Sequence, residues 1–298
     1  MTTVRFAAIP MNSGDDVSAN CRAVSRLLDQ ASADGAKLAV LPENFAAMSS
    51  NEAVRVRIAE VDGSGPIQST LADAAARNGM WVVGGTIPIR SEDPARPFAS
   101  CCIYDEHGDR VGRYDKIHLF DVGIPGGDET YRESANTEAG AQDLVLATPW
   151  GRLGIGVCYD LRFPELFRRM CSKGMDFLAL PAAFTVSTGI VHWQSLVLAR
   201  AIENLCYVVT AAQTGSHPGG RRTYGHSMIV DPWGDIMKDS GESTKIISAP
   251  VDFDRLAELR RKFPVLAHRR LNDASTDNAL MDLQQVRGIG KQESSDFD

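Results

Sequence analysis

Residues 154–170, GIGVCYDLRFPELFRRM, place a cysteine at the junction between a strand and a helix. The apolar run at residues 153–157 is typical of a buried strand. Pro164 suits the first turn of a helix, because its missing N–H would be unpaired there, and Glu165 complements the helix dipole. Cys158 is therefore predicted at the carboxyl end of a strand, where open α/β sheets carry their chemistry.

Outward from this junction, strand and helix patterns alternate along the chain. Apolar runs predict strands at 4–10, 37–43, 80–87, 153–157, 176–182, 206–213 and 245–251. Helical periodicity predicts helices at 16–35, 66–78, 164–173, 189–204 and 254–262, the last with Asp254 as its N-cap. Two hairpins are expected, one turning at 107–109 and one at 231–234. This order predicts an α/β chain with two sheets packed face to face and helices outside.

Composition restricts the classes of function. The 298 residues are 44% hydrophobic and 23% charged, as in a globular protein that dissolves in water. A net charge of −7 argues against general binding to nucleic acid or to a membrane surface. We see neither a signal peptide nor an apolar run of the roughly 18 residues that a membrane helix needs. The six cysteines form no CxxC pair, so we expect free thiols and a cytoplasmic location.

The chain has no linker, repeat or low-complexity tract that would divide it. We therefore expect residues 1–270 to form a single domain. Residues 271–298 are polar and lack periodicity, and we expect them either to be disordered or to lie across a partner subunit.

Several kinds of site have no support in the sequence. There is no GxxxxGK[ST] loop, no GxGxxG after a strand, no HExxH and no GxSxG. The six histidines are scattered, and nothing recommends a metal site. We expect no cofactor and no metal.

Three reactive side chains stand at the margins of apolar runs: Glu43 in LPENF, Lys116 in DKIHLF and Cys158 in GVCYD. Each has an ordinary structural interpretation by itself. A lone cysteine is often a small core residue, a glutamate after a strand is often a cap, and a lysine is usually at the surface. The combination, in this order, is the informative feature.

LPENF, KIHLFD and GVCYDLRFPELFR together resemble the nitrilase superfamily of carbon–nitrogen hydrolases, over about residues 4–271. The resemblance implies a four-layer αββα sandwich that assembles as a homodimer or a larger homo-oligomer through its helices. It also implies a small-molecule amide as substrate.

The resemblance further implies a role for each residue. Cys158 would attack a carbonyl carbon and form a thioester. Glu43 would be the general base and acid, which near neutral pH requires a raised pKa, for example through burial. Lys116 would stabilise the oxyanion, with the backbone N–H of Tyr159 as a second donor.

Further residues are expected around this triad. Glu133, in TYRES, matches a second glutamate of the family that holds Lys116 and the substrate, the alternative being a loop carboxylate. The segment 120–134, FDVGIPGGDETYRES, is expected at the rim of the pocket. The expected substrate-binding residues are Arg162, Phe163, Phe184 and Thr185. For Arg162 a surface salt bridge is equally plausible, and for Phe163 a packing contact at the start of the following helix.

A cysteine–histidine pair of the papain type is the competing catalytic arrangement. His118 and His192 are its candidates. We disfavour it, because a lone histidine more often makes a structural hydrogen bond.

The segments AAFTVSTGIVHWQ, AAQTG and TYGHSMIVDPWG resemble the Nit-type amidases, and most closely the deaminated glutathione amidases. That branch implies cleavage of deaminated glutathione to 2-oxoglutarate and Cys-Gly. Gln194 departs from the family, which more often has Glu there. Two alternatives remain: an ω-amidase acting on 2-oxoglutaramate, and a catalytically silent scaffold of the same fold, whose Cys158 would show no unusual reactivity.

Overall fold

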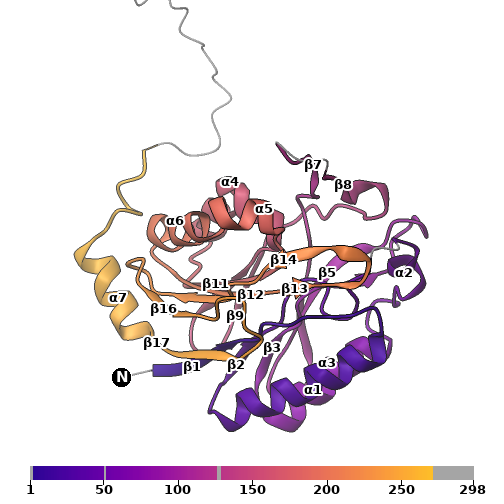
Figure 1. Ribbon diagram of the computed structural model, residues 1–298. Coiled ribbons are helices and arrows are strands. Elements are labelled where there is room, and N and C mark those ends of the chain that lie inside the picture. Colours follow the sequence, from indigo (N-terminus) through magenta and orange to yellow (C-terminus); the bar gives the residue numbers. More distant parts are fainter. Residues whose placement is uncertain (1–2, 50–51, 126–128, 271–298) are drawn as a thin grey trace, which may run out of the picture.

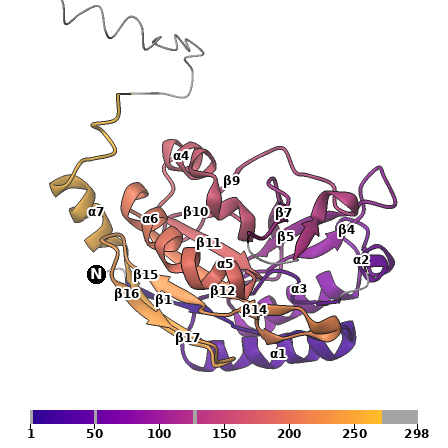
Figure 2. The same cartoon turned by 45° about the horizontal axis from the view of Figure 1, so that its top comes forward.

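The computed structural model describes residues 3–49, 52–125 and 129–270. Two large sheets face one another in the middle of the molecule (Figure 1). Helices α1 (Val17–Ala33) and α3 (Pro66–Asn78) cover the outer face of one sheet. Helices α4 (Pro164–Ser172) and α6 (Gln194–Asn204) lie over the other (Figure 2). The predicted α/β layers, with helices outside two sheets, are confirmed, and the predicted tail lies outside the described residues.

The first sheet has the order β17-β1-β2-β3-β5-β4, with β6 beside β5. Its first three strands in the chain run parallel, and β17 and β5 run antiparallel to their neighbours. The bounds are β1 (Thr3–Ala8), β2 (Leu38–Val40), β3 (Trp81–Val83), β4 (Ile87–Ile89), β5 (Phe98–Tyr104), β6 (Arg110–Asp115) and β17 (Ile247–Asp252).

The second sheet has the order β16-β15-β12-β11-β10-β9, with β10, β11 and β12 parallel. The parallel strands bring their carboxyl ends to one edge of the sheet. The bounds are β9 (Leu144–Ala147), β10 (Arg152–Ile155), β11 (Phe177–Ala182), β12 (Tyr207–Ala212), β15 (Met228–Val230) and β16 (Ile236–Asp239).

Short elements frame these layers. Two small ribbons pair β7 (Asp121–Gly123) with β8 (Thr130–Arg132) and β13 (Thr214–Ser216) with β14 (Arg222–Tyr224). The remaining helices are α2 (Glu52–Arg57), α5 (Val186–Thr188), α7 (Phe253–Lys262), the 3₁₀ turns η1 (Glu133–Ala135), η2 (Cys158–Arg162) and η4 (Pro218–Gly220), and the π-helical turn η3 (Gly189–Trp193).

The two-residue period of β1 explains how the layers hold together. Phe6 and Ala8 point into the core between the sheets, and Phe6 packs against Phe177 of the opposite sheet with ring centroids 5.0 Å apart. Ala7 and Ile9 point the other way, into the core beneath α1 and α3. A strand buried on both faces is typical of a sheet covered by a further layer on each side.

Several predicted boundaries were wrong. The expected helix 189–204 is regular only from Gln194, because a π-helical turn precedes it. The expected strand 80–87 is divided between β3 and β4. Asp252, not Asp254, caps the last helix: its side chain accepts a hydrogen bond from the Arg255 N–H at 2.9 Å, because the helix follows β17 without a loop.

The two expected hairpins are present. β5 pairs antiparallel with β6, and β15 pairs with β16. The turn of the second is closed by a 3.0 Å bond from the Gly234 N–H to the Asp231 carbonyl. This hairpin begins later than predicted, because Tyr224 belongs to β14 instead. Within the described ranges, no helix is long and apolar enough to cross a membrane.

Candidate active site

Glu43, Lys116 and Cys158 come from both sheets and line one cavity of about 730 Å³. Glu43 follows β2, Lys116 directly follows β6, and Cys158 follows β10. The cavity therefore lies where the strand ends of the two sheets meet. The three residues that the sequence singled out are brought together, and Glu133 joins them.

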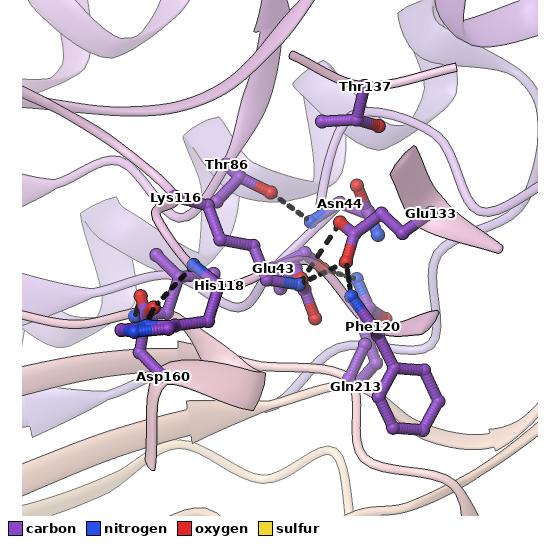
Figure 3. Close-up of polar contacts among 12 residues, drawn as sticks. Glu43, Asn44, Thr86, Lys116, His118, Phe120, Glu133, Thr137, Asp160 and Gln213 are labelled. Atoms are coloured by element: carbon purple, nitrogen blue, oxygen red, sulfur yellow. Dashed lines mark hydrogen bonds and ion pairs between the residues drawn. The ribbon is translucent and has the colours of Figure 1, made fainter. Parts of the chain in front are cut away.

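Lys116 lies between two carboxylates (Figure 3). Its Nζ donates to Glu43 Oε1 at 2.7 Å and to Glu133 Oε2 at 2.8 Å. Only 2% of the Lys116 side chain is exposed. Burial by itself lowers the pKa of Lys116, but the charges of Glu133 and Glu43 more than offset it, so the pKa is raised. The ammonium therefore stays charged in the cavity.

Glu133 is held in place from a second direction. It opens η1, after β8, and its Oε2 also accepts a hydrogen bond from the Phe120 N–H at 2.7 Å. Burial raises the pKa of Glu133, but Lys116 and Arg55 outweigh burial and lower it overall. Glu133 is thus an ionised partner that fixes the position of the Lys116 ammonium.

Cys158 occupies a strained position. Its φ of 47° lies in the left-handed region, which a residue with a side chain rarely adopts. Burial raises the pKa of the Cys158 thiol well above its ordinary value, and the Glu43 carboxylate raises it further. Lys116 and a backbone hydrogen bond from Ala183 act in the opposite direction. The thiol is therefore protonated at neutral pH, and a base must remove its proton before the sulfur can attack.

Asp160 anchors the loop that carries Cys158. It is fully buried, and its carboxylate accepts hydrogen bonds from the Val157 N–H at 2.8 Å and the Tyr114 hydroxyl at 2.7 Å. It also accepts a 3.0 Å bond from the His118 N–H and lies 2.7 Å from His118 Nδ1 (Figure 3). No sequence motif had predicted a role for Asp160. An acidic residue inside an apolar stretch, two positions after the cysteine, was the available signal.

The loop that carries Glu43 is also anchored. Gln213 Nε2 donates to the Glu43 carbonyl at 3.1 Å and to Ser13 Oγ at 2.8 Å. Asn44, next in the chain, has a φ of 55°, and its N–H donates to Thr86 Oγ1 at 2.8 Å. Gln213 is the glutamine of the AAQTG segment, which the sequence offered only as a mark of the amidase branch.

Comparison with known proteins agrees with this site. The carbon–nitrogen hydrolase family model matches residues 5–261. The chain belongs to this family. It is 40% identical over 266 residues to a deaminated glutathione amidase from Synechocystis, covering 88% of this chain and 97% of that protein. An ω-amidase from Homo sapiens is 32% identical over 270 residues, covering 91% of this chain and 96% of that protein.

A solved structure shares the fold of this hydrolase. The NitFhit protein of C. elegans superposes with a TM-score of 0.84 at 36% identity. The match covers 90% of this chain and 65% of that longer one. The predicted recognition as a Nit-type carbon–nitrogen hydrolase, and with it the amidase class, is confirmed.

The expected pocket residues of the hydrolase divide into two groups. Tyr159, Phe184 and Thr185 line the cavity. Arg162 and Phe163 are not among the described lining residues. Their side chains support the wall instead: the guanidinium of Arg162 lies over the Phe184 ring at 5.5 Å.

The two candidate histidines have other partners. His118 lies against Asp160, and its ring stacks on Phe163 with centroids 3.7 Å apart. His192 Nδ1 lies 3.3 Å from a guanidinium nitrogen of Arg162. These contacts give both histidines structural roles, as the sequence interpretation preferred.

The branch segments lie around the cavity. Phe120 and residues 129–133 of the expected rim line it, whereas 126–128 fall outside the described residues. Tyr224 of TYGHSM supports the wall from behind: its N–H donates to the Phe184 carbonyl at 2.9 Å. Gln194, which departs from the family, is exposed at the start of α6. Among the described residues, no group of three or more His, Cys, Asp or Glu side chains is placed to hold a metal ion.

Proposed function

We propose that this hydrolase cleaves deaminated glutathione to 2-oxoglutarate and Cys-Gly, with Glu43, Lys116 and Cys158 as its catalytic residues. The observation that carries the proposal is a neutral, buried thiol beside a carboxylate and a fixed ammonium in one cavity. The relative from Synechocystis, named a deaminated glutathione amidase, supports the choice of substrate.

In the first half of the reaction, Cys158 attacks the amide carbonyl while Glu43 accepts the thiol proton. The carbonyl oxygen becomes an oxyanion. The Lys116 ammonium and the backbone N–H of Tyr159 stabilise this negative charge. Glu133 acts on Lys116, because their ion pair holds the ammonium where the charge develops.

In the second half, the C–N bond breaks and Glu43 returns its proton to the departing nitrogen. A thioester of 2-oxoglutarate stays on Cys158. Glu43 then takes a proton from water as the water attacks the thioester carbonyl, through a second oxyanion. Cleavage of the C–S bond releases the carboxylic acid, and Glu43 returns its proton to the departing sulfur, which regenerates the thiol.

The test compares kcat/KM for deaminated glutathione, 2-oxoglutaramate and glutathione. The first two deliver the same acyl group and differ only in the leaving group. Contacts with the remote dipeptide can offset the cost of orienting the amide, so we expect deaminated glutathione to be preferred by at least about tenfold, or about 1.4 kcal/mol. Glutathione should be poor, because its α-ammonium must be desolvated.

An ω-amidase acting on 2-oxoglutaramate is the second candidate. The human ω-amidase at 32% identity favours it, as does the shared acyl group. A higher kcat/KM for 2-oxoglutaramate than for deaminated glutathione would identify the protein as an ω-amidase. A third outcome, no turnover and no unusual reactivity of Cys158 towards a thiol label, would indicate a silent scaffold.

We also propose that residues 1–270 work as one domain, in the cytoplasm, as a homodimer or larger homo-oligomer. The helices α4 and α6 are the ones that we expect near the interface. Ile190 and Val191, in the π-helical turn before α6, and Ile202, on α6, are 65%, 61% and 49% exposed. Val197 of α6 and Phe167 of α4, which would be candidate apolar contacts by sequence, are fully buried within the subunit and belong to its core. A monomer by light scattering at micromolar concentration would contradict the assembly.

A further inference from the structure

The cavity has an excess of positive side chains. Its charged lining residues are Glu43, Glu129, Glu133, Arg55, Lys116, Arg132, Arg221 and Arg222. Lys116 is neutralised by its two carboxylates, and Glu129 accepts a 2.9 Å hydrogen bond from the Tyr131 hydroxyl. Two arginines, Arg55 and Arg221, are half-buried, whereas the other two are exposed. The proposed mechanism uses neither member of this half-buried pair.

Arg55 lies on α2 and has a buried Nε with no hydrogen-bond partner in the described part of the chain. Burial lowers the pKa of Arg55, although the charges of Glu133 and Glu43 oppose the change. A guanidinium does not lose its proton in proteins, so the positive charge remains. A buried donor without a partner is costly, and an anion in the cavity would remove that cost.

Arg221 has the same property. It follows η4, and its Nε is likewise buried without a partner among the described residues. Its Nη2 donates to the Ala183 carbonyl at 3.3 Å, and its guanidinium lies over the Tyr131 ring at 5.6 Å. These contacts fix the guanidinium at the cavity wall. The charge of Arg221 also lowers the pKa of Arg55, as expected of two cations near one another.

We propose that Arg55 and Arg221 together bind the carboxylate at the far end of the substrate's acyl group. This inference rests on the proposed function, because deaminated glutathione and 2-oxoglutaramate share that carboxylate. The acyl half is favoured over the leaving group because Arg55 lies within the electrostatic reach of Glu133 and Glu43, at the reacting end of the cavity.

Guanidinium groups suit this task. They bind carboxylates through two parallel N–H donors, and charged hydrogen bonds in a water-poor cavity are stronger than neutral ones. A neutral substrate would leave the buried Nε donors of both arginines unpaired. Sites with buried polar groups discriminate strongly against analogues that cannot pair with them.

The kinetic test uses 2-oxoglutaramate and its methyl ester, which carry the same amide and differ in the distal charge. The wild-type protein should prefer the anion. Arg55→Gln and Arg221→Gln should each reduce the anion-to-ester ratio of kcat/KM by at least about tenfold, or about 1.4 kcal/mol. Arg55→Lys should restore part of the ratio. Arg57→Gln is the matched control: Arg57 is exposed on the same helix and is not a described lining residue.

Two results of this test would overturn the proposal. Equal losses for the anion and the ester would mean that the arginines support the fold or the catalytic residues. A loss for deaminated glutathione without a loss for 2-oxoglutaramate would mean that they bind the glycine carboxylate of the leaving group.

A binding test separates this inference from the proposed function. Calorimetry would measure 2-oxoglutarate binding to Cys158→Ala protein, with and without Arg55→Gln or Arg57→Gln. We expect Arg55→Gln to weaken binding at least about tenfold. If this holds while neither named amide is cleaved, the arginine assignment stands and the proposed function fails. If deaminated glutathione is cleaved but the arginine variants change neither binding nor the ratio, the assignment is wrong and the function stands.

Discussion

The cavity has two charged regions that are built in opposite ways. In the buried cluster, formed by Glu43, Lys116, Glu133 and Cys158, the lysine has two carboxylate partners within 2.8 Å. In the arginine pair, Arg55 and Arg221, both Nε atoms are buried without a hydrogen-bond partner among the described residues. The first region is electrostatically complete before any substrate arrives. The second is completed only when an anion binds.

The difference follows from what each region has to do. Stabilising an oxyanion requires a charge that does not move during the reaction, and the two ion pairs hold Lys116 in that way. Selecting a substrate requires donors that a wrong molecule leaves unpaired. Changes in the buried cluster should therefore act on the chemical step, whatever the amide, and changes in the arginine pair should depend on the substrate's charge.

The largest effect is expected from Cys158→Ala. Turnover should be abolished for every amide, because no other nucleophile would form the thioester. The fold should remain, with a loss of stability of about 1–2 kcal/mol, since little volume is removed. Turnover assays and thermal unfolding measure the two effects. Cys206→Ala, at a buried cysteine just before β12, is the control, and appreciable activity in folded Cys158→Ala protein would contradict the nucleophile assignment.

Glu43→Gln and Lys116→Ala should each lower kcat at least about a hundredfold, through loss of the general base or of the oxyanion partner. The factor by which kcat falls should be similar for anionic and neutral amides. Glu138→Gln, a carboxylate paired with Arg96, is the control and should leave kcat unchanged. A chelator should also leave kcat unchanged, and restoration of lost activity by a divalent ion would contradict the metal-free mechanism.

The sequence predicted the buried cluster better than its surroundings. Glu43, Lys116 and Cys158 stand in short motifs beside apolar runs, and the resemblance of these motifs to the carbon–nitrogen hydrolases implied that the three residues act together. Arg55 gave no such signal, because NEAVRVRIAE is typical of any short surface helix. Arg162 was expected in the pocket because the chain must turn beside Cys158, but its guanidinium packs over the Phe184 ring instead, a contact between segments more than twenty residues apart that no local pattern encodes.

The layers of the fold could be predicted because burial on both faces leaves long apolar runs in the strands. The π-helical turn before α6 could not. Gly189 lies so close to Tyr224 that a Cβ there would be 2.3 Å from the ring. That contact joins segments far apart in the sequence, and no local pattern encodes it.

A smaller effect is expected from Asp160→Asn, which acts on the buried cluster through the Cys158 loop. The amide can no longer accept all of the hydrogen bonds that Val157, Tyr114 and His118 make to the carboxylate. We expect a loss of at least about 2 kcal/mol of stability and at least about tenfold in kcat, because the sulfur is displaced.

Chemical denaturation and kcat measured with two amides test this role. The reduction in kcat should be the same for the anion and the ester, since Asp160 does not contact substrate. Asp235→Asn, at an exposed turn carboxylate, should change neither quantity. Full activity in a folded Asp160→Asn protein would mean that the Cys158 loop keeps its shape without this anchor.

The smallest effect is a shift in the pH profile of Cys158 alkylation, and its sign differs between the two partners of the thiol. Burial and the Glu43 charge raise the thiol pKa, so the thiol is protonated at neutral pH and ionises only as the pH rises. Removing the carboxylate in Glu43→Gln should move the midpoint of alkylation to lower pH. Removing the ammonium in Lys116→Met should move it to higher pH, because Lys116 favours the thiolate.

Peptide mapping after iodoacetamide treatment at a series of pH values would follow Cys158 separately from the other thiols, with Arg55→Gln as a comparison from the arginine pair. An unchanged midpoint in both the Glu43 and the Lys116 variant would show that burial alone sets the thiol pKa, and the buried cluster would then lack the opposed charges that distinguish it from the arginine pair.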